Sequence, residues 1–312
     1  RKFKPVCLNL PFEEMDVAGN SSFGGHGIYG ENGYFDIQKC NFFHCLVGIS
    51  LYRMNFLVTL NHFSRVEQAV YAQESNNQFV APQVFVPTVS HNVIEGANYG
   101  FVFFQNNDSS PLIHDNDMDR ISLFGIMVTD QPGLPNRSYI HTNLIKPGSA
   151  GGWKHLYISG IGIGIQLTGT RYAAVCKNTI IHDYATQDNS CIIVENCSYL
   201  TITNNTVRHP NPIDGGYRVG ISCRMTNGST IDCNKFTNPL GLEVRGVCTS
   251  TAISTNTFVK DLYWGMYFIN AATQDQVHTG NRWTYTTTAS NPGARYLGTG
   301  ASSNLFYVDG DE

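Results

Sequence analysis

The sequence predicts an all-β protein in which short parallel strands follow one another in stacked coils. Three observations lead to this fold class. A pattern of Val or Ile, then Asn three residues later, then Ile, Val or Phe two residues further on, recurs along the chain. Successive copies stand mostly 22 to 35 residues apart, a spacing typical of one coil of a solenoid. Amphipathic helices and Asn-Gly hairpin turns are almost absent between the copies, which argues against antiparallel sheets.

The repeated Asn marks the bend between two strands of each expected coil. Asn suits a sharp bend because it tolerates the left-handed backbone conformation, and stacked side-chain amides can hydrogen-bond from one coil to the next. A variant copy, Ile37-Cys40-Phe42, has Cys in place of Asn. The seven full copies are Val58-Asn61-Phe63, Val89-Asn92-Ile94, Ile140-Asn143-Ile145, Val175-Asn178-Ile180, Ile202-Asn205-Val207, Ile231-Asn234-Phe236 and Ile253-Asn256-Phe258.

A second strand of each coil opens with a small residue followed by an apolar one. In Ile49-Ser50-Leu51-Tyr52, apolar and polar residues then alternate, as in a strand with one buried face. The 51 residues from Asn92 to Asn143 leave room for an abbreviated turn around residues 121–126. The opening pairs are Gly48-Ile49, Ala69-Val70, Gly100-Phe101, Gly220-Ile221, Gly241-Leu242 and Gly265-Met266.

Together, the Asn turn and the Gly-Ile strand resemble the right-handed parallel β-helix of the pectin-lyase-like superfamily. That superfamily includes polysaccharide lyases, polygalacturonases, mannuronan epimerases and many bacteriophage tailspikes. The resemblance covers residues 37–258 and implies a single-stranded right-handed parallel β-helix with Asn-containing turns and a C-terminal capping segment. We expect an N-terminal cap in residues 1–33, the β-helix in 34–270, and a C-terminal cap or subunit-docking segment in 271–312. The resemblance also implies that saccharides bind beside the loops that join the third sheet to the first.

Composition narrows the function further. Only 14% of the 312 residues are charged and the formal net charge is -4, so no basic surplus favours nucleic acid as a partner. No uncharged apolar run of 18 residues exists, so we expect no membrane insertion. The nine cysteines show no metal-type spacing, and we expect neither a metal nor a cofactor. Buried reduced thiols are expected at Cys40, Cys176, Cys191, Cys223 and Cys233.

The first-sheet strands carry the candidate catalytic residues. Side chains that alternate with the buried ones should point outward, which places Glu195, Arg224, Glu243 and Arg245 on one exposed face. For hydrolysis, Glu195 and Glu243 are the natural acid and base. They lie two coils apart, roughly 9.6 Å at the backbone, which is near the carboxylate separation of inverting rather than retaining enzymes. Arg224 would then hold one carboxylate ionised or bind an acidic sugar. An elimination would need an Arg, Lys or His base instead, and plain charge pairing between strands remains open.

Loops over the same coils add expected substrate-binding groups. Aromatic faces stack on sugar rings, while charged groups donate directional hydrogen bonds to hydroxyls and carboxylates. Another segment, residues 114–120, has alternating carboxylates of the kind that bind calcium. It lacks the Gly and the distal Glu of an EF-hand loop, so it is interpreted as a solvated acidic loop. The expected substrate-binding residues are Arg224, Arg245, His182, Asp183, Asp214, Arg218, Tyr267 and Trp264.

Three classes of function fit these features. The first is a phage tailspike-like module that binds a bacterial surface polysaccharide, with or without cleaving it as a hydrolase or lyase. The low charge, the missing signal-peptide core and the free thiols favour it. We expect a homotrimer in the virion, with outward apolar residues such as Val102, Phe104, Ile193 and Ile269 as subunit contacts. The alternatives are a secreted lyase or glycoside hydrolase acting on a polyuronate, and a structural β-helix without enzymatic activity.

Overall fold

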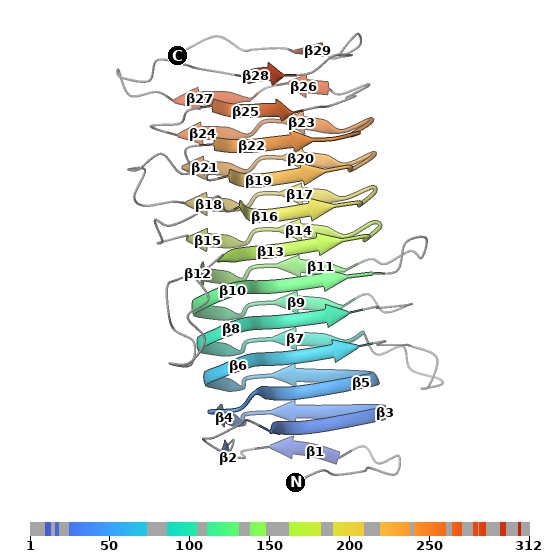
Figure 1. The fold of residues 1–312 in the computed structure, drawn as a ribbon, viewed down its shortest axis with the longest axis vertical. Helices are drawn as coiled ribbons and strands as arrows, with labels where there is room; N and C mark the ends of the chain where they lie inside the picture. Colours follow the sequence, from blue (N-terminus) through green and yellow to red (C-terminus); the bar gives the residue numbers. More distant parts are fainter. Residues whose placement is uncertain are drawn as a thin grey trace.

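The chain folds as a right-handed parallel β-helix, in which each strand pairs in parallel with strands one coil away (Figure 1). This is a computed structural model. It describes residues 10–13, 16–18, 25–73, 86–104, 111–130, 138–147, 162–181, 190–208, 219–237, 240–259, 264–269, 277–279, 281–284, 294–297 and 305–306. Over these residues there is no helix, and hence none long and apolar enough to cross a membrane.

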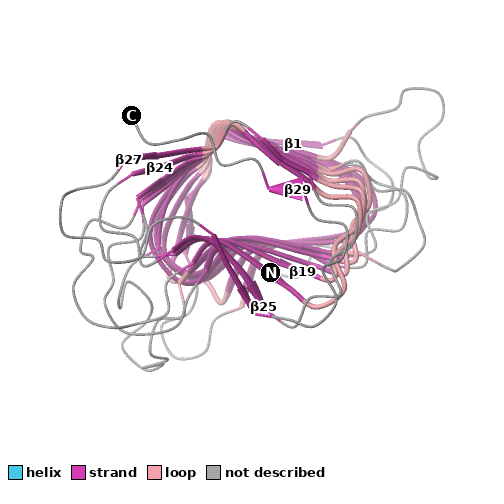
Figure 2. Cartoon of the chain, turned by 90° about the horizontal axis from the view of Figure 1, so that it is seen from above, coloured by secondary structure: helices cyan, strands magenta, loops and turns pink. Residues whose placement is uncertain are grey.

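Three parallel sheets form the sides of the coil, as the view along the axis in Figure 2 shows. The first sheet contains β3 (His26–Gln38), β5 (Val47–Thr59), β6 (His62–Gln73), β8 (Val93–Phe104), β10 (Asp117–Thr129), β13 (Ile163–Thr168), β16 (Ser190–Glu195), β19 (Val219–Arg224), β22 (Leu240–Arg245), β25 (Trp264–Ile269) and β28 (Ala294–Leu297).

The other two sheets use the remaining strands together with parts of the long ones. The second sheet joins the C-terminal halves of β3 and β5 to β1 (Leu10–Glu13), β7 (Thr88–Ser90), β9 (Leu112–His114), β11 (Tyr139–His141), β14 (Ala174–Cys176), β17 (Thr201–Thr203), β20 (Thr230–Asp232), β23 (Ala252–Ser254), β26 (Val277–Thr279) and β29 (Leu305–Phe306). The third joins the N-terminal parts of β6, β8 and β10 to β2 (Asp16–Ala18), β4 (Asn41–Phe43), β12 (Leu144–Pro147), β15 (Thr179–Ile181), β18 (Thr206–Arg208), β21 (Lys235–Thr237), β24 (Thr257–Val259) and β27 (Arg282–Thr284).

The core is a set of stacked apolar columns inside the coil. The residues expected to face inward are fully buried, and aromatic rings of successive coils stack, as Phe42 does on Phe63 at 4.8 Å between centroids. Gly164 and Gly220 open first-sheet strands because a Cβ there would meet the carbonyl oxygen of the next coil at 2.7 Å and 2.5 Å. The small residue before each apolar one is therefore required by the close approach of neighbouring coils. The inward column of the first sheet is Ile49, Val70, Phe101, Ile126, Ile165, Ile192, Ile221 and Leu242.

A continuous ladder of buried asparagines runs along the turn between the second and third sheets. In each step the side-chain amide and the backbone N–H of one Asn both donate to the Oδ1 of the Asn one coil further on, as Asn61 does to Asn92 at 3.1 Å and 3.0 Å. Each amide also donates to a backbone carbonyl of the preceding coil. The predicted Cys variant continues the ladder, since the backbone N–H of Cys40 donates to Asn61 Oδ1. The members are Asn61, Asn92, Asn116, Asn143, Asn178, Asn205, Asn234, Asn256 and Asn281.

The sequence-based reason for the Asn at the bend was wrong in one respect. The ladder asparagines do not adopt the left-handed conformation. The residue before each ladder Asn from Asn61 to Asn256 does, as does Lys39 before Cys40, with φ between 49° and 57°. The Asn is needed because its amide can donate twice and its oxygen can accept twice inside a buried turn, which no other side chain but Gln does. The left-handed residues are Lys39, Leu60, His91, Asp115, Thr142, Lys177, Asn204, Cys233 and Thr255.

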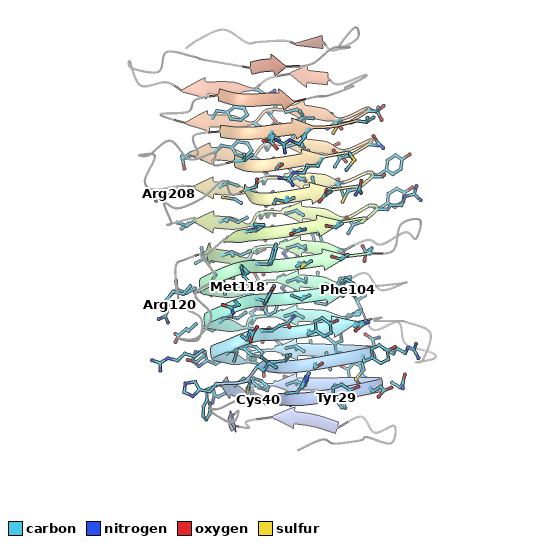
Figure 3. All side chains as sticks on the ribbon, viewed as in Figure 1. Tyr29, Cys40, Phe104, Met118, Arg120 and Arg208 are labelled. Atoms are coloured by element: carbon cyan, nitrogen blue, oxygen red, sulfur yellow. The ribbon has the colours of Figure 1, made fainter. Side chains whose placement is uncertain are left out.

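The abbreviated turn expected between Asn92 and Asn143 was also wrong. A complete coil fills that interval, with strands β9 and β10 and its own ladder residue, Asn116. The repeat pattern missed it because Met118 occupies the core position where the other copies have Ile, Val or Phe, and Met118 is fully buried (Figure 3). Parallel pairing also includes β1, β2, β28 and β29, which lie in the segments expected to act as caps.

Candidate functional site

The outward face of the first sheet carries two neighbouring columns of side chains, whose register the strand pairing fixes. Glu195 at the end of β16 pairs with Arg224 at the end of β19, and Arg224 pairs with Arg245 at the end of β22. Two residues earlier on the same strands, Ile193 pairs with Ser222 and Ser222 with Glu243. The predicted gathering of Glu195, Arg224, Glu243 and Arg245 over three successive coils is therefore present.

The expectation that this face is exposed was wrong for the column nearer the strand starts. Ser222 is 0% exposed and Glu243 only 3%. Ser222 Oγ donates to Glu243 Oε1 at 3.1 Å and accepts from Arg224 Nε at 3.2 Å, while Arg245 Nε lies 3.7 Å from Glu243 Oε1. We call Glu195, Arg224 and Arg245 the outer column, and Ile193, Ser222 and Glu243 the inner column. The two arginines of the outer column thus extend back over the inner column and help to cover it. Glu243 is a buried carboxylate held by a hydroxyl and a guanidinium.

The two candidate catalytic carboxylates lie further apart than the coil count alone suggests. Glu243 belongs to the inner column and Glu195 to the outer one, so they differ by two strands and by two residues along the strand. Strand spacing of about 4.8 Å and a rise of about 3.3 Å per residue give about 12 Å between their backbones. Among the described residues, no ion pair reaches the Glu195 carboxylate, and Arg224 bonds Ser222 instead. Glu243 is buried, so the two carboxylates are not presented together on the surface as a paired acid and base would be.

Several predicted substrate-binding residues cannot be placed. His182, Asp183, Asp214 and Arg218 lie outside the described residues. The backbones of Trp264 and Tyr267 lie in β25, where Tyr267 pairs with Glu243 and so continues the inner column.

The outward apolar residues expected to form subunit contacts are partly accounted for within the chain. Val102 and Ile193 are 6% and 7% exposed, so neither offers a free apolar surface, and that expectation was wrong for both. Phe104 is half-buried at the end of β8 (Figure 3). The reason is the same as for Glu243, because inner-column side chains are covered by their neighbours.

The described cysteines are free thiols, and most are buried as predicted. Cys40, Cys176, Cys191 and Cys223 are buried, and burial, together with nearby Cys248, Cys197 and Glu243, holds the pKa of the Cys223 thiol well above its ordinary value. Cys233 is the exception, since it is exposed at a left-handed turn position beside Asp232. The expectation of burial was wrong there because the residue before each ladder Asn from Asn61 to Asn256 is exposed.

Sequence reasoning missed a cluster of histidines on the second sheet. His91, His114 and Asp115 bring their ligand-type atoms within 4.8 Å of one another, and His141 stacks on His114 with ring centroids 4.9 Å apart. The segment interpreted as an acidic loop is instead a turn followed by β10, and Asp115 occupies its left-handed position. The signal was available, because His114 and His141 both stand two residues before a ladder Asn.

Comparison with known proteins gives one family match and several structural likenesses. A family model described as periplasmic copper-binding protein (NosD) matches residues 86–238, somewhat less than half of the chain. No protein among those with curated functions matches.

The structural likenesses are to other parallel β-helices. The Streptococcus pneumoniae surface protein and adhesin PfbA is 8% identical over 92% of this chain and 83% of that one, with a TM-score of 0.45. The A-module of the Azotobacter vinelandii mannuronan C-5 epimerase AlgE4 is 11% identical over 94% and 88%, with a TM-score of 0.37. The polygalacturonase of Erwinia carotovora is 8% identical over 93% and 99%, with a TM-score of 0.35. These are pectin-lyase-like folds, and at such identities they say nothing about the substrate of this chain.

Proposed function

We propose that the protein binds an acidic bacterial surface polysaccharide along the outward face of the first sheet, across β16, β19 and β22, in the manner of a tailspike module. The observation that carries this proposal is the register of Arg224 directly opposite Arg245. Like charges in directly opposite positions repel, so this pair is unfavourable unless something anionic offsets it. Glu243 lies near Arg245, whereas Arg224 bonds the neutral Ser222 hydroxyl. Glu195 is opposite Arg224 on its other side, but the described residues include no ion pair between the two side chains. An acidic sugar would supply the second anion, and guanidinium groups bind carboxylates in bidentate geometry.

The shape of the surface supports a linear ligand. Outward columns continue from coil to coil at a spacing of about 4.8 Å, so polar groups repeat along the axis of the β-helix. Below Glu195 the outer column continues with two uncharged residues, Thr168, which is half-buried, and Thr129, whose hydroxyl oxygen is buried. A chain of sugars lying along the axis would therefore meet its charged contacts on β16 to β22 and a neutral polar contact, Thr168, on β13.

Binding, rather than cleavage, is the activity that the carboxylate positions favour. The Glu243 carboxylate is buried beneath Ser222 and Arg245, so it is not presented to a substrate together with Glu195 as an acid and a base would be. Release of oligosaccharide from the bound polymer tests this directly. If the protein cleaves, Glu195→Gln and Glu243→Gln should each abolish release, and undiminished release by both variants would exclude them as the catalytic pair.

The tailspike form of this proposal includes assembly as a homotrimer in the virion. Buried free thiols are consistent with folding in a reducing cytosol before release. Light scattering should then give three times the chain mass. A monomer that releases unsaturated or reducing sugars from a polyuronate would instead identify a secreted lyase or hydrolase, and a monomer without glycan affinity would leave a structural β-helix.

Binding of an acidic polysaccharide, measured by calorimetry with the wild type and Arg224→Gln, tests the proposal. Loss of affinity in the variant is expected.

A further inference from the structure

The turn between the second and third sheets places three metal-ligating side chains on two successive coils. His91 occupies the left-handed position before ladder Asn92, and Asp115 occupies the same position before Asn116. His114 ends β9 and so lies one residue before Asp115. Coil stacking therefore brings His91 beside the His114-Asp115 pair, although 23 residues separate them in sequence.

The backbone of this cluster is fixed by the asparagine ladder. The backbone N–H of His91 donates to His114 O at 3.3 Å, and the Asn116 amide donates to the same oxygen at 2.9 Å. Asn116 also donates to Val89 O and to Asn143 Oδ1, at 3.0 Å and 2.9 Å. A buried, fully bonded ladder residue thus holds the turn that presents the three side chains, and a site built on a rigid turn loses little entropy when a ligand binds.

The ligand atoms converge outside the coil. His114 Nδ1 lies 2.6 Å from Asp115 Oδ2, and His91 Nε2 lies 3.8 Å from the same oxygen. The two imidazole rings are nearly perpendicular, with centroids 5.5 Å apart. Tetrahedral zinc holds N and O ligands at about 2.0–2.2 Å, which places ligand atoms about 3.4 Å from one another. Small side-chain rotations that lengthen the first distance and shorten the second would reach this geometry.

The surroundings orient one of the ligands. The ring of His141 stacks parallel on His114, with an interplanar angle of 4°, and Tyr139 packs on His141 at 4.4 Å. His141 is not among the side chains whose ligand atoms converge; its Nδ1 is bonded to Thr142 Oγ1 at 2.7 Å, and its ring supports that of His114. The side chains of His91 and Asp115 are 53% and 37% exposed, so an ion can reach them from solvent.

We propose that His91, His114 and Asp115 bind a divalent transition-metal ion of the zinc type, with at least one coordination position left for water. Two imidazoles and one carboxylate match the ligand preference of zinc and cobalt, whereas calcium and magnesium prefer oxygen ligands alone. Three protein ligands with an open position are typical of exchangeable or reactive sites rather than of closed structural ones.

Titration of the full 312-residue chain with ZnSO₄ by calorimetry tests this site, with CoCl₂ absorption spectra as a second readout. The exposed thiol Cys233 is removed by Cys233→Ser in every variant so that it cannot compete. His91→Asn and Asp115→Asn suit the left-handed backbone, because Asn204 occupies the same position before Asn205. Together with His114→Gln, each should weaken zinc binding by about 10-fold or more and reduce the tetrahedral cobalt band.

His62 and Glu95 provide the matched control. They form a histidine-carboxylate pair at 3.5 Å on neighbouring strands, with both side chains about half exposed, and among the described residues they have no third metal-ligating side chain beside them. His62→Gln should leave zinc affinity and the cobalt spectrum unchanged. Equal affinity in the wild type and all three site variants would overturn the proposal, and so would a loss in His62→Gln as large as that in His114→Gln. Circular dichroism spectra identical to the wild type confirm that each variant remains folded.

Discussion

The side-chain amide of Asn178 and its backbone N–H both donate to Oδ1 of Asn205, each at 3.0 Å, inside a buried turn. Asn205 in turn donates to Val175 O and to Asn234 Oδ1. Each ladder residue therefore satisfies buried polar groups on both neighbouring coils as well as its own. The ladder links coils whose apolar columns alone would not fix their register.

Asn205→Ala should destabilise the protein strongly. It leaves the backbone N–H of Asn178 and one N–H of its side-chain amide without an acceptor, although the amide keeps its bond to Ile140 O. Val175 O also loses the donor that Asn205 supplies, so we expect a loss of about 3 kcal/mol or more. Urea unfolding followed by circular dichroism measures the loss. The control is Asn227→Ala, at an exposed Asn that accepts from Thr249, where about 1 kcal/mol or less is expected. Similar losses in both variants would contradict the role of the ladder.

Gly220→Ala tests the close approach of the coils. The added methyl group would meet Gly241 O and the Phe236 ring at 2.5 Å, so we expect destabilisation of about 1–3 kcal/mol and a lower Tm. Gly33→Ala is the matched control, because its nearest neighbour, Met54 Cε, would lie 3.9 Å away. A Tm unchanged in Gly220→Ala would show that the coils can separate at little cost.

Thiol labelling should distinguish the turn cysteine from the core cysteines. Cys233 is exposed, whereas Cys223 is fully buried and its thiol pKa is raised by that burial. We expect iodoacetamide to modify Cys233 in the native protein and Cys223 only after denaturation, as peptide mass spectrometry would detect. Rapid native labelling of Cys223 would mean that the upper coils open readily.

The stability of the turn at Asp232 should depend on acidity. Burial alone would raise the pKa of Asp232, but hydrogen bonds from Thr255, Cys233 and Ser254 hold it below its ordinary value. Its contribution is therefore complete above about pH 3.9, the value in an unfolded chain, and is lost as the pH falls through the folded-state pKa. Asp232→Asn should lose about 1 kcal/mol near neutral pH, and its difference from the wild type should shrink below pH 3.9 in urea unfolding. A difference that does not change with pH would rule out this explanation.

The repeat in the sequence predicted the fold and the outward columns because both depend on local rules. Asn every 22 to 35 residues fixes where each coil turns, and period-2 alternation fixes which residues of β16 or β22 face outward. The left-handed residue before each Asn was not predictable in this way, since Lys39 and Leu60 are not residues that favour positive φ. Their conformation is imposed by the ladder, whose bonds compensate for the local strain.

The sequence predicted which residues form the candidate site but not how deeply each of them is buried. The alternation placed Glu243 outward, yet its burial depends on the conformation of Arg245, which extends back towards it. The histidine cluster was missed because Met118 stands where the repeat pattern requires Ile, Val or Phe, so the coil that contains His114 was not recognised. Once Asn92, Asn116 and Asn143 are aligned, His114 and His141 lie in one column and His91 beside them. Spatial neighbours in a solenoid can therefore be read from the sequence only when every coil is found.

The most direct test of the polysaccharide-binding surface is calorimetric titration with polygalacturonate and an acidic capsular polysaccharide, using neutral dextran for comparison. We expect Arg224→Gln and Arg245→Gln each to lower the affinity for the acidic polymers by about 10-fold or more, because each variant loses a charge-assisted contact. The affinity of the wild type should fall as the salt concentration rises. Lys177→Gln, at an exposed lysine in the turn between the second and third sheets, should bind like the wild type. Undiminished affinity in both first-sheet variants, or equal affinity for dextran, would contradict the proposal.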